Sequence, residues 1–381
     1  MKPHQIEKMN KRLDSLDALR GFDLILLVVF EEFLWKLRPA VDASWFDSLM
    51  QHFTHKDWQG FSFWDLVMPL FMFMSGATIP YSLAKYRNGT GREGLYRRLA
   101  RRFLLLWLLG MVCQGNLLGL DPQRIYLFSN TLQAIAVGYI FAAIIFLNTR
   151  IWTQVAIAVI LLLAYWGAME FVTIGSYGGG NYTPEGNLAE IIDRWVLGRF
   201  RDGAQVVDGA VVFANGYNYT WILSSLNFIV TVMTGVFAGE ILKSSLAQRR
   251  KLVLLFAIGI AMALCGWLLN GIHPVIKRIW TSSMVLVSSG YCFLLTWLFY
   301  YWIDCRGHRR GLTLLKIYGM NSITAYVVSL VINFSSVSHS LLHGLETYVG
   351  AYYPALLMLS NASIVFVILL ILYRNKIFLR V

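Results

Sequence analysis

Long apolar stretches recur along the whole chain and are separated by short polar segments. Each stretch is about 20 residues long, the length that an α-helix needs to cross a bilayer. The pattern predicts an all-α protein, a polytopic membrane helix bundle with about ten transmembrane helices. The expected spans are 22–38, 60–84, 103–120, 129–148, 152–174, 219–242, 252–271, 281–303, 313–334 and 352–373.

Composition supports the same fold class. Of the 381 residues, 57% are hydrophobic and 14% are charged, whereas soluble domains carry about 25% charged residues. This deficit of charge excludes an ordinary soluble protein, so the solvent for most of the chain is lipid. Residues 1–381 are expected to form a single transmembrane domain without internal repeats, and the four cysteines are expected to be structural.

The distribution of basic residues predicts the orientation. The formal net charge is +12, and most of the 33 Lys and Arg lie in one alternating set of connecting segments. Such asymmetry is typical of cytoplasmic loops, so no nucleic-acid partner is expected and both termini should be cytoplasmic. The basic segments are 1–21, 85–102, 149–151, 243–251, 304–312 and 374–381.

Two outward-facing segments are long enough to form structure of their own. In 175–218, Asn187 precedes Glu190 by three residues, which predicts the start of a short helix over Leu188 to Leu197. The segment 39–59 is rich in aromatic residues and histidine, a composition typical of the membrane interface.

Three acidic residues fall inside predicted spans, where a charge is costly and marks a functional hypothesis. Glu31 and Glu32 lie in the first span, and Asp65 lies near the start of the second. Adjacent residues on a helix point about 100° apart, so the two glutamates are not expected to face the same partner. Glu31 is expected to line a polar cavity or to pair within the bundle, and the position of Asp65 favours a structural role.

His55 is the candidate general base. It lies in the outward-facing segment 39–59, and acyl transfer to an amine or a hydroxyl needs a base that accepts a proton near neutral pH. The alternative is an interfacial histidine that only forms hydrogen bonds, and His52 shares that alternative.

The predicted cytoplasmic segment 85–102 is rich in arginine. Arginine binds phosphate in a bidentate manner, so this segment is a candidate site for the phosphates of a nucleotide-type cofactor. Topogenic charge and lipid headgroup binding are the alternative. No glycine-rich phosphate loop accompanies it, and no metal site is expected.

Several motifs spread over nearly the whole chain form a recognisable set. They are RLDSLDALRG at 12–21, His55-x-x-Trp58-x-Gly60 followed by Asp65, Pro69 and Gly76, NTLQAI at 130–135, Lys277-x-x-Trp280-Thr281-Ser282-Ser283, and GMNS at 319–322 with Tyr326. This set resembles the heparan-α-glucosaminide N-acetyltransferase family, in the form of a bacterial-type member of the transmembrane acyltransferase superfamily.

The resemblance implies a multi-pass enzyme that takes acetyl-CoA from the cytoplasm and acetylates an extracytoplasmic amino sugar of the glucosamine or N-acetylglucosamine type. The implied location is the bacterial cytoplasmic (inner) membrane, the implied partners are acetyl-CoA, the sugar and membrane lipids, and a homodimer is left open. The resemblance gives the active-site role to His55. In the mechanism that we expect, Glu31 orients or assists, and an amide, Asn130, Gln133 or Asn321, donates to the developing oxyanion. The further candidate residues are Arg20, Arg97, Arg98, Arg101, Gln133 and Asn130 for acetyl-CoA, and Trp58, Asp65, Lys277 and Trp280 for the acceptor.

Departures from the family pattern leave the acceptor open. Glu31 stands where the lysosomal enzyme has an asparagine, and the run Asn218-Tyr219-Thr220-Trp221 replaces an Asp-Pro-Glu-Gly run of many relatives. Glucosamine, N-acetylglucosamine acetylated on oxygen and a glycan fragment all fit. Whether His55 acts as base or takes the acetyl group itself is also open. The rival functions are a secondary transporter for a sugar or related solute and a non-catalytic glycan- or lipid-binding membrane protein.

Overall fold

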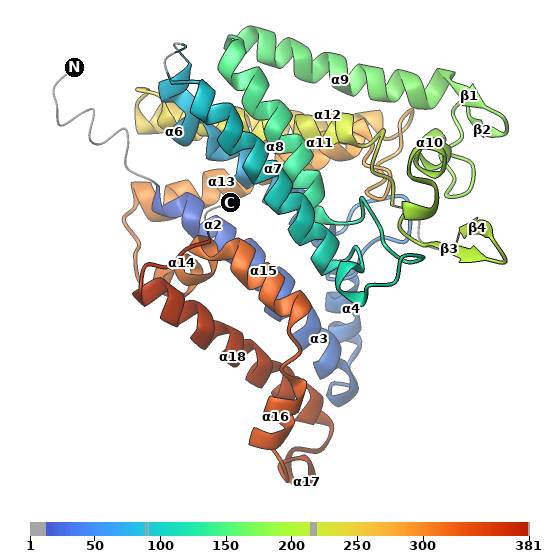
Figure 1. The fold of residues 1–381 in the computed structure, drawn as a ribbon. Helices are drawn as coiled ribbons and strands as arrows, with labels where there is room; N and C mark the ends of the chain where they lie inside the picture. The colour runs from blue at the N-terminus through green and yellow to red at the C-terminus, as the bar shows by residue number, and fades with distance from the viewer. Residues whose placement is uncertain (1–12, 88, 90, 214–218, 380–381) are drawn as a thin grey trace.

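The protein is a helical bundle, seen here in a computed structural model that describes residues 13–379 except 88, 90 and 214–218 (Figure 1). The predicted cytoplasmic location of both chain ends falls on residues outside that range. The α-helices are α2 (Asp14–Ile25), α3 (Glu31–Leu37), α4 (Ser44–His52), α5 (Val67–Ala77), α6 (Ile79–Leu83), α7 (Glu93–Cys113), α8 (Thr131–Asn148), α9 (Ile151–Phe171), α10 (Leu188–Leu197), α11 (Ser225–Lys243), α12 (Gln248–Leu269), α13 (Ser282–Phe299), α14 (Leu312–Met320), α15 (Ser322–Val331), α16 (Ser335–Leu341), α17 (Glu346–Val349) and α18 (Tyr353–Arg374).

Short 3-10 and π segments join or extend these helices, and strands are few. The 3-10 segments are η2 (Arg38–Ala40), η3 (Phe63–Leu66), η4 (Ala84–Tyr86), η5 (Leu117–Gly119), η6 (Gly198–Phe200) and η8 (Gly350–Tyr352), and the π segments are η1 (Leu26–Phe30) and η7 (Tyr300–Cys305). Two small antiparallel hairpins, β1 (Thr173–Ile174) with β2 (Tyr177–Gly178) and β3 (Ala204–Val207) with β4 (Ala210–Phe213), complete the described secondary structure.

The prediction of an all-α, polytopic bundle is confirmed. Among the described helices, fewer than the predicted ten are long and apolar enough to span a membrane. Within the described residues seven helical stretches are long and apolar enough to cross a membrane, and an eighth if the bent pair α14 and α15 counts as one. The predicted spans 22–38 and 103–120 also fall on helices, α2 to α3 and α7, but these carry several charged residues. The predicted span 313–334 is broken by a bend of 75° between α14 and α15.

The bundle is apolar both inside and outside, as expected for a protein in lipid. Helices α5, α8 and α11 are mostly buried, whereas α9 and α12 are mostly exposed. The exposed face of α9 carries large apolar side chains, among them Ile160 and Leu163, which are 62% and 56% exposed. In water such a face would be unstable, so these helices cover the side of the bundle that meets lipid.

Glycines allow the central helices to pack closely. A Cβ atom on Gly76 of α5 would lie 1.9 Å from the carbonyl oxygen of Val232, and one on Gly235 of α11 would lie 1.9 Å from that of Phe73. Any side chain at either position would force the two backbones apart. This contact fixes α5, and with it the segment that precedes it, against the centre of the bundle.

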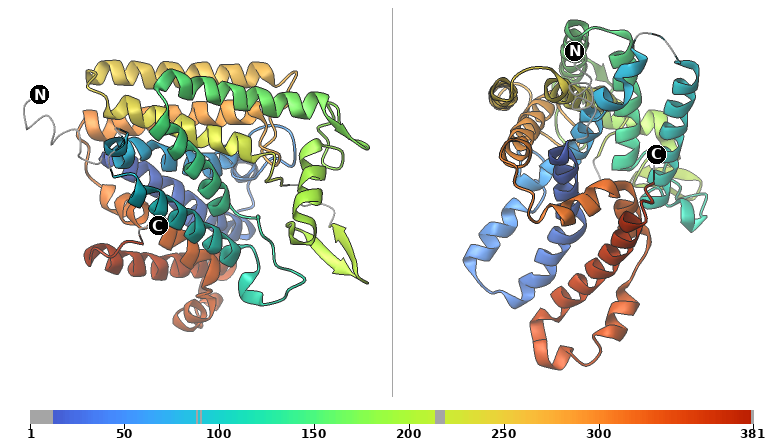
Figure 2. Two further views of the ribbon diagram at one scale, coloured as in Figure 1. Left: turned by 45° about the horizontal axis from the view of Figure 1, so that its top comes forward. Right: turned by 90° about the vertical axis from the view of Figure 1, so that its left-hand side faces the viewer.

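The two ends of the bundle differ in character. The turns between α6 and α7 and between α8 and α9 lie at one end, and α10 with both hairpins lies at the other (Figure 1). We call these the basic end and the hairpin end. The predicted helix over 188–197 is confirmed as α10, and the Asn187 side chain accepts a hydrogen bond from the Glu190 backbone N–H at 2.9 Å as predicted. Helices α3, α4 and α16 to α18 extend away from the remaining helices (Figure 2).

Candidate functional site

His55 lies in the loop between α4 and η3, and its orientation is set by Asp65. The His55 Nδ1 lies 2.8 Å from Oδ1 of Asp65. Ser62 begins η3 with a capping box, in which its backbone N–H and hydroxyl donate to Asp65 Oδ2 at 2.9 and 3.0 Å. Asp65 is 1% exposed and lies 3.6 Å from the ammonium nitrogen of Lys277, which favours the ionised carboxylate, so this side chain acts as an acceptor. His55 Nδ1 therefore donates to it, and Nε2 is left as the basic nitrogen.

Lys277 approaches the same imidazole from the loop between α12 and α13. Its Nζ lies 3.0 Å from Nδ1 and 3.4 Å from Nε2 of His55, and 3.6 Å from Oδ1 of Asp65. The two loops are joined by their backbones, because the Gly60 N–H donates to the Val275 carbonyl at 2.8 Å. A base, a carboxylate and an ammonium from distant parts of the sequence thus meet at one point.

Burial tunes the charge of this cluster. Burial lowers the pKa of His55, and the ammonium of Lys277 lowers it further, while the hydrogen bond to Asp65 opposes both effects. Burial also lowers the pKa of Lys277 to about 8, against the attraction of Asp65 and Glu31. At neutral pH the imidazole is therefore mostly neutral and able to accept a proton, while Lys277 is mostly charged.

A cavity of about 370 Å³ opens beside these groups, and we call it the His55 cavity. Glu31 and Glu32 both line it. They directly follow the π segment η1, and π segments occur often at functional sites. The polar and aromatic lining residues are Glu31, Glu32, His55, Trp64, Gln114, Ser129, Thr131, Tyr219, Trp221, Lys277, Tyr326 and Ser329.

Two buried polar atoms that line the His55 cavity have no hydrogen-bond partner within the described part of the chain. They are the Ser129 hydroxyl oxygen and the Trp221 indole nitrogen. Buried polar groups are normally satisfied, so these atoms indicate a polar ligand or water in the cavity. Sequence reasoning missed both residues, because neither bears a charge and Trp221 falls in a run where the family resemblance breaks down.

The segment that carries Trp221 is fixed to the hairpin end by α10. The buried carboxylate of Asp193 accepts the backbone N–H groups of Trp221 at 2.7 Å and Ile222 at 2.9 Å. Asp193 lies beside a buried pair in which Arg201 donates to Glu190. Burial raises the pKa of Asp193 to about 7. Helix α10 thus positions one wall of the cavity.

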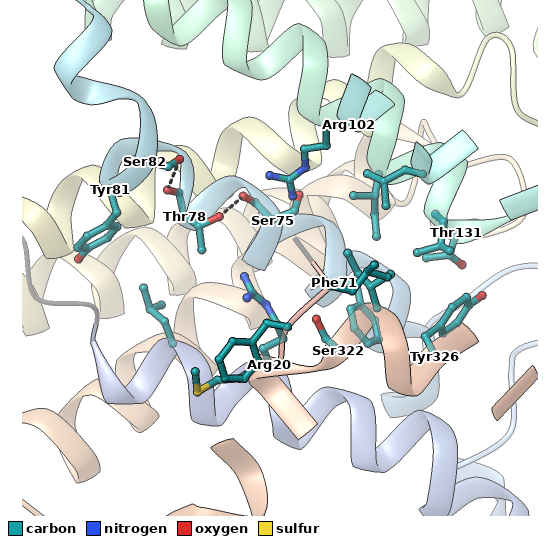
Figure 3. A pocket seen from close by; sticks show the side chains of 18 of the residues that line it. Arg20, Phe71, Ser75, Thr78, Tyr81, Ser82, Arg102, Thr131, Ser322 and Tyr326 are labelled. Carbon is teal, nitrogen blue, oxygen red and sulfur yellow. Dashed lines mark hydrogen bonds between the residues drawn. The ribbon is translucent and has the colours of Figure 1, made fainter. Parts of the chain in front are cut away.

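A second cavity of about 630 Å³, the Arg20 cavity, is lined by Tyr81 and Ser82 of α6, the helix that precedes the turn at the basic end, and is seen from close by in Figure 3. Arg20 of α2 and Arg102 of α7 line it together with the hydroxyl groups of Ser75, Thr78 and Ser82. The Arg102 guanidinium stacks 3.8 Å from the Tyr139 ring, and its Nε has no hydrogen-bond partner among the described residues. Two arginines thus lie in a mainly apolar lining, and Arg102 belongs to the arginine-rich segment 85–102 in which the sequence predicts phosphate contacts.

The two cavities adjoin. Phe71, Thr131 and Tyr326 line both of them. Thr131 and Tyr326 lie together at one end of the Arg20 cavity, and Tyr81 lies at the other (Figure 3). Tyr81 lies in α6, just before the turn at the basic end. His55 and Lys277, which line the other cavity, lie in loops near the hairpin end, where Trp58 bonds to Tyr182. A ligand long enough to pass the junction would therefore have one part in each cavity.

The structure brings together only some of the predicted site residues. His55, Asp65, Lys277 and Glu31 meet at the His55 cavity, and Arg20 lines the other cavity. Arg97 and Arg101 are exposed and line neither cavity, while Arg98 donates to the Tyr86 hydroxyl at 2.7 Å. The roles of these arginines in cofactor binding stay predictions.

The predicted amides have structural partners. Asn130 caps α8, accepting the Leu132 N–H at 2.7 Å, and Gln133 completes that capping box. Asn321 lies at the break between α14 and α15 and donates to the Ile317 carbonyl at 3.0 Å. None of the three lines either cavity.

The two predicted tryptophans, Trp58 and Trp280, lie outside the lining of the His55 cavity. Trp58 donates to the Tyr182 carbonyl at 2.8 Å, and Trp280 donates to the Thr231 hydroxyl at 3.1 Å. Neither lines the His55 cavity, so both support the loops that carry His55 and Lys277. Their binding of an acceptor stays a prediction. The four cysteines are free, and the described residues contain no group of His, Cys, Asp and Glu that could hold a metal ion.

Comparison with known proteins agrees with the motif resemblance. Residues 12–177 match the family model for the catalytic region of heparan-alpha-glucosaminide N-acetyltransferase. The human protein of that name is 27% identical over 373 residues, covering 85% of this chain and 53% of its own length. The mouse protein is 26% identical over 367 residues, covering 83% and 53%. The chain therefore spans about half the length of the curated relatives it matches.

Proposed function

We propose that the protein is a transmembrane acetyltransferase that moves an acetyl group from cytoplasmic acetyl-CoA to an amino sugar on the far side of the membrane. The observation that carries the proposal is the pair of adjoining cavities, one positive and near the basic end, the other containing His55 and near the hairpin end. The names of the human and mouse relatives support the reaction class.

The Arg20 cavity suits the donor. Arg20 and Arg102 would attract the phosphates of coenzyme A, and the unpaired Nε of Arg102 is available as a donor among the described groups. The pantetheine arm would then extend toward Thr131 and Tyr326. In this arrangement the thioester reaches the junction while the charged nucleotide stays at the basic end.

The His55 cavity suits a sugar. The unpaired Ser129 hydroxyl and the Trp221 indole N–H can bond to sugar hydroxyl groups. Glu31 and Glu32 add negative charge, which favours a cationic ammonium over a neutral sugar. Glucosamine fits this chemistry better than N-acetylglucosamine, whose nitrogen is uncharged.

The reaction follows from the roles of the cluster. The bound ammonium first loses one proton to solvent, and the neutral amine then attacks the thioester carbonyl carbon while His55 Nε2 takes one N–H proton. The tetrahedral intermediate then collapses, the C–S bond breaks, and the imidazolium returns the proton to the departing thiolate. The products are an N-acetylated sugar and free coenzyme A. Asp65 holds the imidazole in the required tautomer, and Lys277 adds positive charge beside the developing oxyanion.

Orientation is part of the proposal. If the basic end faces the cytoplasm, as the distribution of Lys and Arg predicts, the sugar is acetylated outside it. The resemblance to bacterial relatives suggests the cytoplasmic membrane of a bacterium.

Acetyl-CoA binding and product formation test the proposal. Acetyl-CoA should raise the melting temperature of the detergent-purified protein, and mass spectrometry should find an acetylated product when glucosamine is added. An unchanged melting temperature together with no acetylated product from glucosamine, N-acetylglucosamine or a glucosamine-terminated oligosaccharide would refute it. A transporter of the same fold would show neither response to acetyl-CoA.

A further inference from the structure

Tyr326 occupies the point where the two cavities meet. It lies on α15, is 9% exposed, and lines both cavities together with Phe71 and Thr131. If the donor extends from one cavity and the acceptor sits in the other, the thioester carbonyl must lie at this junction. Phe71 has no polar atom to offer there, so the hydrogen-bond donors of the junction are the hydroxyl groups of Thr131 and Tyr326.

The hydrogen of the Tyr326 hydroxyl is available to a ligand. The Asn130 side-chain oxygen accepts the Leu132 backbone N–H at 2.7 Å, which fixes the amide so that its nitrogen faces the other way. That nitrogen donates to the Gln114 side-chain oxygen at 2.8 Å and to the Tyr326 hydroxyl oxygen at 3.2 Å. The Thr131 hydroxyl also forms a side-chain hydrogen bond with the Tyr326 hydroxyl, and when Thr131 donates, as Asn130 does, the Tyr326 hydrogen remains for a ligand.

This arrangement makes the hydroxyl a strong donor. A hydrogen bond received at the oxygen polarises the O–H group, so successive hydrogen bonds strengthen one another. A phenol is also a better donor than the aliphatic hydroxyl of Thr131, because it is far more acidic. A polarised donor held rigidly in a water-poor site is what stabilises a developing oxyanion.

We infer that Tyr326, oriented by Asn130, donates the hydrogen bond that stabilises the oxyanion of the tetrahedral intermediate. The inference rests on the proposed acetyl transfer and adds a catalytic residue to it. In the reaction the carbonyl oxygen gains negative charge when the nucleophile adds and loses it when the C–S bond breaks. The Tyr326 proton is not transferred, so Tyr326→Phe should affect the barrier and leave ground-state binding intact.

The experiment compares two isosteric variants with a matched control. Tyr326→Phe removes the hydroxyl and keeps the ring. Asn130→Asp keeps a residue that caps helices well but replaces the donor by a carboxylate, which would accept the Tyr326 hydrogen and withdraw it from the substrate. The control is Tyr318→Phe, because Tyr318 is a buried tyrosine of α14 that stacks on Phe366 and lines neither cavity.

The expected result is a fall in kcat of about 10²-fold for Tyr326→Phe, the usual effect of removing one oxyanion donor. Asn130→Asp should lower kcat by a similar factor, and the double variant should be no slower than the slower single variant, because both changes remove the same interaction. The dissociation constant for coenzyme A, measured by calorimetry, should stay within about twofold of wild type. Tyr318→Phe should leave kcat unchanged.

Two outcomes contradict the inference while acetyl transfer by the wild type stands. In one, Tyr326→Phe keeps wild-type kcat. In the other, its affinity for coenzyme A falls as much as its kcat, which would make Tyr326 a structural or binding residue. Additive losses in the double variant would refute the role of Asn130. A wild-type protein that acetylates no sugar would instead refute the proposed function. The role of Tyr326 in that reaction would then be refuted as well.

Discussion

His55 is the residue on which the proposed chemistry depends most. Its Nδ1 is bound to the buried Asp65 and its ring contacts Lys277. If Nε2 accepts the proton of the nucleophile, His55→Ala should lower kcat by about 10²–10⁴-fold, the usual contribution of a positioned base. Affinity for acetyl-CoA should not change, because the Arg20 cavity does not include His55. Steady-state kinetics together with calorimetry measure both quantities.

His52→Ala is the matched control for that variant. His52 ends α4, is exposed, and lines neither cavity, so His52→Ala should remain active. Near-normal turnover of His55→Ala would remove His55 from the mechanism and leave Glu31 as the next candidate base. An acetyl group trapped on His55 in the absence of sugar would make the residue a nucleophile instead.

The pH dependence of the reaction should report both His55 and Lys277. Activity should fall on the acid side of the profile, because the protonated imidazole cannot accept a proton. Since the pKa of His55 is lowered, this fall should come at a lower pH than for an ordinary histidine. Lys277 has a pKa of about 8, so activity should fall again as pH rises through that value and the ammonium loses its charge. The profile of kcat/KM against pH is the measurement.

Lys277→Arg separates the two limbs. Arginine stays charged over the whole range, so the alkaline limb should disappear while the acid limb remains. Protonation of an amine acceptor affects only the acid side, which makes the alkaline side diagnostic. An alkaline limb that persists unchanged in Lys277→Arg would show that Lys277 does not cause it.

Residues that carry a charge or a motif could be found from the sequence, and those defined by packing could not. His55, Asp65 and Lys277 stood out by chemistry or by motif, and they do meet. Ser129 and Trp221 had no such signal, because their importance comes from an unsatisfied polar atom beside a cavity. That property depends on how distant helices pack, which local sequence does not encode.

At the scale of elements, the contact between α5 and α11 fixes the helix that follows the loop with His55. Gly235 leaves no room for a side chain, because a Cβ atom there would lie 1.9 Å from the Phe73 carbonyl oxygen. Gly235→Ala should therefore destabilise the protein by about 1–3 kcal/mol, the usual cost of overpacking. Thermal melting in detergent, followed by fluorescence, can measure the change.

Gly167→Ala on α9 is the control for this prediction. No described residue from outside the surrounding turns of α9 lies within 4 Å of a Cβ at Gly167, and alanine favours a helix over glycine by about 1 kcal/mol. This variant should melt at the wild-type temperature or above it. Equal melting temperatures for the two variants would show that the contact between α5 and α11 does not limit stability.

Periodicity and capping predicted most elements because both are local. Helix α10 and its Asn187 cap are where the sequence indicates them. The bend of 75° at Asn321 had no local signal. It adjoins Gly319, whose Cβ would lie 2.0 Å from the Asp17 carbonyl oxygen of α2. Contact with a helix some 300 positions away in the sequence therefore accompanies the break, and only the folded structure reveals it.

At the scale of the whole molecule, the two ends of the bundle differ chemically. Lys and Arg concentrate in the segments of the basic end, and the His55 cavity lies toward the hairpin end. In the proposed function, the two adjoining cavities would let an acetyl group pass between the ends while the phosphates of its donor stay at the basic end. The central claim is therefore that donor and acceptor react from opposite sides of one membrane.

Reconstitution in sealed vesicles tests this claim most directly. Vesicles loaded with glucosamine would receive acetyl-labelled acetyl-CoA on the outside only, since the cofactor does not cross lipid. The account predicts labelled N-acetylglucosamine inside the vesicles, made by the molecules whose basic end faces outward, and none with His55→Ala. Labelled product that forms only when both substrates are on the same side, or no product from either arrangement, would contradict it.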